Sequence, residues 1–540
     1  MTIQMTLYGI INNAAVTIFS AILMVSLFPD WDLGILAWIA IVPLLLIVSS
    51  RGRIEGFFLA YLCGILFFLG TFDWIRGIAN YRWYHHAILA FYLGAYFGLF
   101  GLEVGYISKH LGQSAGLWAA PFLWVALEYI RSNFFFLALP WQLLGHSQYQ
   151  HLAAIQIAAL FGTYSIGFLI VLVNAGIACL VLVLLSLFQA RRSRRSCEMV
   201  SKKWALALVS SALLCTALSL GYGHRAISKT ITGKPIDVAM IQGNIDQSKK
   251  WDPEYADEII QTYEDLTLKA GLNRPELIIW PETATPGSIS LNPEILNKLN
   301  QMVLKTGTPL VFGSAQHQKF MKADQERPHL VNSAFLMIPG NKNAELQQYD
   351  KIRRLPFAEY LPQKGIIPWK WINVSSLSEY DSGQQPVVFA LSPYRFGVTI
   401  CWENIFPDFI RQFVKQGAQF VINITNEARF GKTAAPHQLL AISVFRAVEN
   451  EIFIIRCANT GVSCIIDPRG RIVKRLQDEN GQDLFVRGIL NGTIIPTDSK
   501  TFYTRNGDLV PIAAIAVSFV FIFIAWSKPL AKRKTAHGIE

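Results

Sequence analysis

Three residues of this chain point to covalent chemistry: a cysteine, a glutamate and a lysine that each follow an apolar or strand-like run. Cys401 ends the run at residues 396–401, and Glu282 and Lys351 lie just beyond two others. A β-branched run that turns abruptly polar is typical of a buried strand delivering a side chain to a sheet edge. Taken alone, Cys401 is more often a buried packing residue. The neighbouring carboxylate and ammonium make it a candidate nucleophile.

A thiol, a carboxylate and an ammonium brought together suit acyl transfer through a thioester. The thiolate is the reactive form of cysteine, and a free thiol is mostly protonated at neutral pH. Glu282 can take the thiol proton as a general base. Lys351 can stabilise the negative charge that develops on the attacked carbonyl oxygen. The cysteine–histidine pairing of papain-type enzymes is not indicated, and His437 is expected at the surface of a predicted helix.

The composition indicates that much of the chain faces something other than water. Charged residues make up 16% of the 540 residues and apolar residues 52%, whereas charged residues are about a quarter of a soluble domain. The long apolar runs lie in the first part of the chain and near its end. With about 20 apolar residues per span, eight membrane helices are predicted, at residues 8–28, 33–50, 55–75, 86–107, 115–131, 162–189, 204–222 and 508–527.

Basic residues gather beside these predicted helices. The densest run lies within residues 191–203, and a second lies within residues 528–534. The positive-inside rule places both on the cytoplasmic side, so the net charge of +11 does not indicate a nucleic-acid partner. With eight spans, the charged region before the last helix lies across the membrane, which in a bacterium is the periplasm.

The predicted fold is a polytopic α-helical membrane bundle with an inserted α/β domain. Residues 1–223 hold seven membrane helices, residues 224–505 the inserted domain, and residues 506–540 the last helix and a basic cytoplasmic tail. In the insert, strand-like runs alternate with amphipathic helices, which is the pattern of a layered α/β domain. We expect strands at residues 236–241, 277–280, 310–313, 333–338, 396–401, 420–424, 452–456 and 462–467, and helices at 254–270, 293–305 and 434–449.

Three further features concern the membrane half and the cysteines. Residues 133–156 are apolar but interrupted by Pro140 and Gly145, so we expect irregular backbone there rather than a span. Glu103 and Glu128 are functional-site candidates, because carboxylates within a membrane are costly, although either can lie near a helix end. The seven cysteines show no paired spacing, so neither a disulfide framework nor a metal site is predicted.

The chemical motifs resemble those of the nitrilase, or carbon-nitrogen hydrolase, superfamily. Within it the chain is similar to the apolipoprotein N-acyltransferase family, and the similarity extends to residues 121–128 and 140–145 of the membrane half. The motifs that carry the resemblance in the insert are Trp280-Pro281-Glu282, Tyr349-Asp350-Lys351, residues 356–362 and Ile400-Cys401-Trp402-Glu403.

The resemblance implies an αββα sandwich with Glu282 as base, Lys351 as oxyanion stabiliser and Cys401 as nucleophile. It assigns supporting roles to Glu359, Glu403, Trp251 and Trp402. Trp251 and Trp402 can equally be packing residues, and Glu403 can equally be a helix N-terminal residue. The family's substrates would be a phospholipid acyl donor and a diacylated lipoprotein acceptor. We expect a monomer in the bacterial inner membrane, with no cofactor and no metal.

The chain departs from the family pattern near the expected substrate mouth. In the stretch Asn426 to Lys432 it carries Glu427, Arg429 and Lys432 where the family has Asp, Trp and Asp, and Trp402 stands where the family commonly has Tyr. Asn426, Arg429 and Lys432 are therefore candidate substrate-mouth residues. Two other functions stay open: a membrane-tethered amidohydrolase that releases its acyl group to water, and a non-catalytic lipid or lipoprotein binder.

Overall fold

The computed structural model describes residues 2–78, 81–193, 200–318, 329–340, 346–372 and 379–537. The chain divides by its internal contacts into a helical unit and an α/β unit. The helical unit comprises Met1–Ser228 with Asn506–Glu540, and the α/β unit comprises Lys229–Arg505. Part of the basic run predicted within residues 191–203 lies outside the described residues.

Among the residues that the structure describes, the helical unit contains five helices that are long and apolar enough to cross a membrane. The other predicted spans fall on helices outside this set: residues 8–28 on α1, residues 115–131 on α6, and residues 33–50 on the short elements η1, α2 and α3. The number of eight spans therefore stays a prediction. The five helices are α4 (Arg53–Thr71), α5 (Trp83–Leu111), α9 (Tyr164–Ser193, apolar to Phe188), α10 (Lys202–Ile227) and α16 (Leu509–His537, apolar to Lys528).

The remaining helices of this unit lie outside this set, and α1 contributes only its apolar part Asn13–Val25 to the shorter apolar helices. The irregular backbone predicted for residues 133–156 is confirmed, since only one-turn helices interrupt it. The elements are α1 (Thr2–Val25), η1 (Gly34–Leu36), α2 (Ala37–Ala40), α3 (Val42–Ser50), η2 (Asp73–Gly77), α6 (Gln113–Asn133), η3 (Phe135–Leu137), η4 (Leu144–Gln148), α7 (Leu152–Ile155) and α8 (Ala158–Phe161).

Glu128 and Arg131 on α6 hold that irregular stretch in place. The buried Glu128 carboxylate accepts a hydrogen bond from the Leu144 amide at 2.8 Å. The buried Arg131 guanidinium donates to the carbonyls of Leu139 and Trp141 at 3.1 and 2.8 Å. Because buried backbone groups need hydrogen-bond partners, these contacts give Glu128 a structural role. Glu103 lies half-buried on α5, and its function stays a prediction.

The α/β unit is built from two six-stranded mixed sheets. Their strand orders are β12-β1-β2-β3-β4-β5 and β11-β10-β9-β8-β7-β6. In each sheet the three strands of the parallel core, β1-β2-β3 and β7-β8-β9, are flanked by antiparallel neighbours. The strands are β1 (Ile236–Gln242), β2 (Leu277–Ile279), β3 (Leu310–Gln318), β4 (His329–Met337), β5 (Gln347–Asp350), β6 (Val388–Leu391), β7 (Tyr394–Ile400), β8 (Phe420–Thr425), β9 (Phe453–Ala458), β10 (Cys464–Ile466), β11 (Ile472–Arg475) and β12 (Gly488–Ile494).

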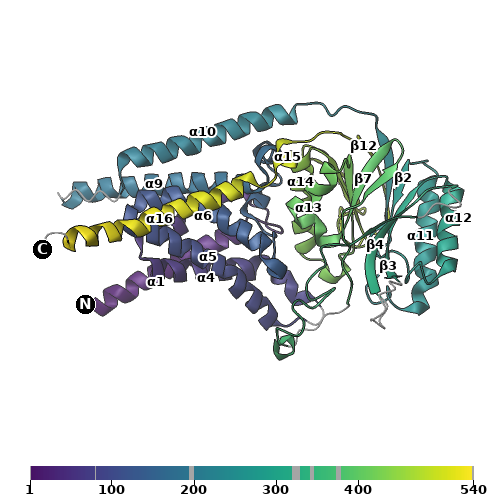
Figure 1. Cartoon of the computed structure of the whole chain (residues 1–540), viewed down its shortest axis with the longest axis horizontal. Helices are drawn as coiled ribbons and strands as arrows, with labels where there is room; N and C mark the ends of the chain where they lie inside the picture. The colour runs from purple at the N-terminus through teal and green to yellow at the C-terminus, as the bar shows by residue number, and fades with distance from the viewer. Residues whose placement is uncertain are drawn as a thin grey trace. The chain divides into compact units, whose positions relative to one another are not determined.

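Helices cover the outer faces of the two sheets. Figure 1 shows α11 and α12 on one side of the strands and α13 and α14 on the other, which gives the layer order helix, sheet, sheet, helix. Buried side chains of α11 and α12, such as Ile260 and Leu299, pack with Trp280 and Phe312 in one core cluster. The helices are α11 (Ala256–Gly271), α12 (Pro293–Thr306), α13 (Pro407–Lys415) and α14 (Ala435–Asn450), with η5 (Pro253–Tyr255), η6 (Trp369–Ile372), η7 (Cys401–Ile405), η8 (Ala428–Phe430) and α15 (Phe502–Asn506).

The eight predicted strands and three predicted helices of the insert are all present, with shifted ends. Sequence reasoning missed β5, β6, β11, β12 and α13. The β5 sequence Gln-Gln-Tyr-Asp is polar because this strand lies at the edge of its sheet. The β12 strand contains two glycines and an asparagine, residues that are depleted in strands.

Candidate active site

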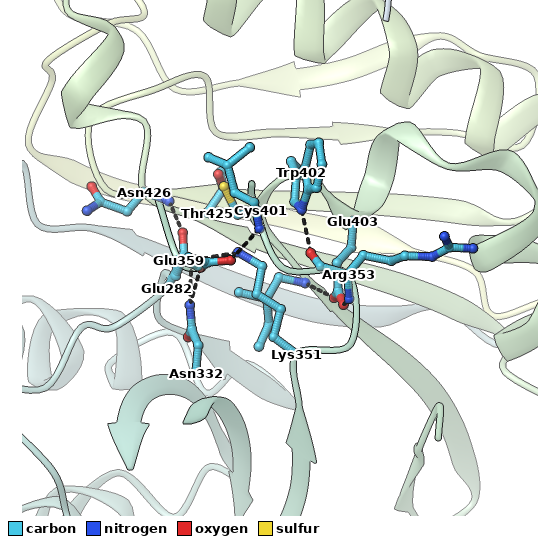
Figure 2. A network of polar contacts seen from close by, with 12 residues as sticks. Glu282, Asn332, Lys351, Arg353, Glu359, Cys401, Trp402, Glu403, Thr425 and Asn426 are labelled. Carbon is cyan, nitrogen blue, oxygen red and sulfur yellow. Dashed lines mark hydrogen bonds and ion pairs between the residues drawn. The ribbon is translucent and has the colours of Figure 1, made fainter. Parts of the chain in front are cut away.

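The three predicted catalytic side chains all follow strands of the α/β unit. Glu282 lies three residues after β2, and Lys351 directly follows β5, so both come from the first sheet. Cys401 directly follows β7 of the second sheet and begins η7. Figure 2 shows that these side chains meet in one polar network. The site therefore exists only where the two sheets face each other.

Cys401 has a backbone conformation that is rare for a residue with a side chain. Its φ of 57° lies in the left-handed region, where a non-glycine residue is strained. The Asn423 side chain holds this turn by donating to the Cys401 carbonyl at 3.0 Å. The thiol forms a side-chain hydrogen bond with Thr425. Burial and the Glu282 carboxylate raise the pKa of the Cys401 thiol to about 12, against the opposing effect of Lys351. The resting thiol is therefore neutral and needs a base.

The Glu282 carboxylate is buried and fixed at both oxygens. Oε1 accepts from Asn332 Nδ2 at 2.8 Å, and Oε2 accepts from the Asn426 amide at 2.8 Å. Lys351 Nζ lies 3.6 Å from Oε1. Two hydrogen bonds and a nearby cation leave the carboxylate little rotational freedom, which is the geometry that a positioned base needs.

Lys351 is buried between two carboxylates. Its ammonium donates to Glu359 Oε1 at 2.7 Å, and the second Glu359 oxygen accepts from the Leu355 amide at 2.7 Å. Burial lowers the pKa of Lys351, but Glu359 and Glu282 outweigh this effect and raise it above its ordinary value. Lys351 thus stays a cation throughout the neutral range.

Glu403 is buried and acts as a structural anchor behind the cysteine. One oxygen accepts from the amides of Ile352 and Arg353 at 2.8 and 2.9 Å, and the other accepts from the Ile400 amide at 2.8 Å. The Tyr349 hydroxyl donates to the same carboxylate at 2.8 Å. Burial raises the pKa of Glu403 to about 7. These bonds tie the segment that follows Lys351 to the turn that presents Cys401.

The two tryptophans of the predicted set differ in their surroundings. Trp402 is 6% exposed, donates its indole N–H to the Arg353 carbonyl and meets Phe406 edge to face. Trp251 is 46% exposed, and the Lys250 ammonium lies 6.0 Å from its ring centroid. Trp402 is thus a packing residue beside the nucleophile, whereas Trp251 presents an accessible apolar face.

The three substrate-mouth candidates also differ. Asn426 supports the site directly, because its amide binds Glu282 and its side chain binds Gln247 and Asn459. Arg429 lies exposed on η8. Lys432 donates to Gln482 at 3.3 Å on the surface.

His437 corrects one prediction. It was expected at the surface, but it is half-buried and its ring lies 3.1 Å from Asp483. The helix α14 that carries it is buried over most of its length, so the polar face seen in the sequence packs against other polar groups. Within the described ranges, no three His, Cys, Asp or Glu side chains cluster as metal ligands.

Sequence reasoning missed Lys250 as a site residue. Its ammonium is buried and donates to the backbone carbonyl of Glu282 at 3.0 Å. Lys249, the preceding residue, is instead exposed and paired with Glu258 at 3.0 Å. No pattern in the sequence separates these two adjacent lysines. Asn332 and Asn423 were missed for the same reason, since asparagine at a strand position carries no functional signal by itself.

Comparison with known proteins matches both units. Residues 20–176 match the model of the apolipoprotein N-acyltransferase N-terminal domain, and residues 237–496 match that of the carbon-nitrogen hydrolase domain. The chain is 34% identical to the apolipoprotein N-acyltransferase of Geobacter metallireducens, over 96% of this chain and 95% of the relative. It is 30% identical to that of Chlorobaculum tepidum, over 94% and 95%, and 31% identical to that of Rickettsia typhi, over 86% and 88%.

Proposed function

The chain belongs to the apolipoprotein N-acyltransferase family and acts as an N-acyltransferase in lipoprotein biosynthesis. We propose that Glu282, Lys351 and Cys401 carry out the transfer. The observation that supports these roles is the convergence of a buried carboxylate, a buried ammonium and a cysteine at three strand ends. The membrane half matched by the family model favours transfer over a soluble-type amidohydrolase.

In the acylation step, Glu282 takes the thiol proton of Cys401, and the sulfur attacks the ester carbonyl of a phospholipid. Lys351 and neighbouring N–H groups stabilise the oxyanion of the tetrahedral intermediate. The carbon–oxygen bond then breaks, and Glu282 returns its proton to the departing glycerol oxygen. The products are an acyl thioester on Cys401 and a lysophospholipid.

In the transfer step, the α-amine of a diacylglyceryl-cysteine lipoprotein attacks the thioester. The carbon–nitrogen bond forms, the carbon–sulfur bond breaks, and the thiolate leaves with a proton delivered through Glu282. Glu359 holds Lys351, and Glu403 holds the cysteine turn, so both support the reaction without touching the acyl group.

The setting that we propose is the bacterial inner membrane. About eight spans anchor the chain as a monomer, the α/β unit faces the periplasm, and the basic loops face the cytoplasm. Both lipid substrates then keep their acyl chains in the bilayer while their reacting groups reach the site. Exposed Arg429 binds the phospholipid phosphate, so that Arg429→Ala weakens phospholipid use; unchanged kinetics would contradict this contact.

One experiment tests the activity as a whole. Purified protein is incubated with phospholipid and a diacylated lipopeptide, and the products are weighed by mass spectrometry. We expect the lipopeptide to gain one acyl chain and the phospholipid to become a lysophospholipid. Release of free fatty acid without lipopeptide acylation would support the hydrolase instead, and no acyl adduct on Cys401 would favour a non-catalytic binder.

A further inference from the structure

Lys250 places a second buried ammonium at the site, and the proposed roles do not use it. It is 6% exposed, and among the described residues the acceptor of its hydrogen bond is the Glu282 carbonyl at 3.0 Å. An ammonium has three N–H donors. A buried ammonium with unused donors either contacts a substrate group or gives up a proton, because an unpaired buried charge is costly.

The segment that carries Lys250 is fixed from the far side of the site. Asn459 exchanges two hydrogen bonds with the backbone of Ile245, at 2.9 and 2.8 Å. Asn459 and Gln247 also both bind the side chain of Asn426, at 3.1 Å each. Asn426 in turn donates its amide to Glu282. Lys250 is therefore held in place by the same network that fixes the base.

The charged and titratable groups that act on Lys250 are Glu282, Arg429 and Cys401. Burial lowers the pKa of Lys250 to about 8, with Arg429 adding to the effect and Glu282 and Cys401 opposing it. The pKa of Lys351, by contrast, is raised by its two carboxylates. Of these two lysines, Lys351 therefore keeps its proton throughout the neutral range, whereas Lys250 gives up its proton more readily.

The proton balance of the transfer step requires such a group. An α-amino group has a pKa of about 7.7–8.0, so much of the lipoprotein acceptor arrives as an ammonium. To become an amide nitrogen, this ammonium must lose two protons. One proton ends on the sulfur of Cys401 as the thiolate leaves. The second needs another acceptor, because Glu282 must be ionised again before the next acylation step. The acylation step creates no such surplus.

We propose that Lys250, as a neutral amine, accepts this surplus proton from the lipoprotein's α-ammonium, which makes it a catalytic residue of the transfer step alone. This role rests on the proposed function. The basicity of the Lys250 amine is close to that of the substrate's α-amine, so the proton moves between two groups of similar proton affinity. Lys250 then releases the proton to solvent before the next lipoprotein binds.

Two variants and a matched control separate this role from a structural one. Lys250→Arg keeps a buried cation that cannot act as a base, since the guanidinium does not deprotonate in proteins. Lys250→Met removes both charge and base. Lys249→Arg, made at the exposed neighbour, is the control. The two half-reactions are measured separately: thioester formation with phospholipid alone by mass spectrometry, and discharge of the preloaded enzyme by a diacylated lipopeptide at pH values from about 6 to about 9.5, a range that spans the pKa of the amine.

For Lys250→Arg we expect thioester formation within about threefold of the unmodified enzyme and lipopeptide acylation slowed by about 10²-fold at neutral pH, the usual range for a lost acid–base group. The deficit shrinks as pH rises, because the acceptor then arrives as a free amine. Discharge by hydroxylamine, which is neutral at pH 7, stays unchanged. The control matches the unmodified enzyme in every assay.

Three outcomes would overturn the inference. One is lipopeptide acylation by Lys250→Arg at the normal rate and with the normal pH profile. The second is an equal loss of rate in both half-reactions. The third is an equal loss of rate when hydroxylamine replaces the lipopeptide. Either of these two would indicate a structural role. If Lys250→Met fails to form the thioester, the results for Lys250→Arg alone decide whether the inference holds. Failure of the unmodified enzyme to form a thioester would instead refute the proposed function, on which the inference depends.

Discussion

Glu282→Gln is the substitution that isolates the chemistry of the base from the shape of the site. The amide has the size of the carboxylate, and its oxygen can still accept from the Asn426 amide, which lies 2.8 Å from Glu282. The new NH₂ group would face Asn332, whose Oδ1 accepts no hydrogen bond within the described part of the chain. Rotation of the Asn332 amide supplies an acceptor there, so we expect the variant to fold.

The expected loss of acylation rate depends on how strongly the Cys401 thiol holds its proton. Because burial raises the pKa of the Cys401 thiol, very little of it is ionised at pH 7 without help from a base. Loss of a general base costs about 10²–10⁴-fold in rate, which is about 2.7–5.5 kcal/mol at about 1.4 kcal/mol per tenfold change. We expect acylation to slow by about 10³-fold at pH 7.

The pH dependence provides the second signature. In the variant the Glu282 charge is gone, but burial still raises the pKa of the Cys401 thiol, so the thiol stays mostly protonated and solvent must remove its proton. The variant's rate should rise about tenfold per pH unit between about pH 7 and about pH 9, whereas the unmodified enzyme should show no such slope. The assay is single-turnover release of lysophospholipid from detergent-solubilised protein, with thermal unfolding as a check on folding.

Glu264→Gln is the matched control, since this partly exposed glutamate of α11 pairs with Lys305 on the outer surface at 3.6 Å. It should leave the rate unchanged. If Glu282→Gln folds and acylates within tenfold of the unmodified enzyme at pH 7, Glu282 is not the base that activates Cys401. A slow variant with no dependence on pH would contradict the reasoning about the thiol pKa.

Three further substitutions test the supports of the site. Gly313→Ala would place a Cβ 2.6 Å from the Thr283 amide nitrogen and 2.8 Å from the Glu282 Cα; because backbone atoms must move to relieve this overlap, we expect acylation to fall at least tenfold and the melting temperature, read by circular dichroism, to drop as well. Glu403→Gln leaves at least one of four donors, two of them buried, without an acceptor, at a cost of about 1–3 kcal/mol that a thermal shift assay should detect; an unchanged melting temperature would refute the anchoring role. Asn423→Ala removes the donor to the Cys401 carbonyl. It should slow thioester formation about tenfold, which corresponds to the loss of about 1–1.5 kcal/mol of hydrogen bonding. Full activity would show that the left-handed turn at Cys401 does not depend on this hydrogen bond.

The positions of the three central side chains could be predicted because each follows a strand. Strand ends in layered α/β domains lie at one edge of a sheet, so a polar residue directly after an apolar run is a strong positional signal. This reasoning placed Cys401 at the end of β7 and Glu282 after β2. For Lys351 the signal was weaker, because β5 is a short polar edge strand that the expected strands did not include.

The burial of Lys250 could not be predicted from the sequence. Its burial depends on a loop that Asn459 fixes from more than 200 residues away in the sequence. Lys249 and Lys250 have the same side chain and adjacent positions, and yet one pairs with Glu258 in solvent and the other lies against Glu282. Long-range contacts of this kind leave no local periodicity, so burial of a single charged residue in a loop becomes visible only in three dimensions.

The pairing of β1 with β12 determines how the α/β unit can be carried by a membrane protein. The first and last strands of the unit lie side by side and antiparallel, with Ile236 opposite Ile494. The chain therefore enters and leaves the unit at neighbouring points. Loop-closure entropy is small when the ends of an insertion are already close, and units of this kind tolerate transplantation and altered chain connectivity. A complete catalytic module can thus be gained or exchanged between two membrane helices without a change in the path of either helix.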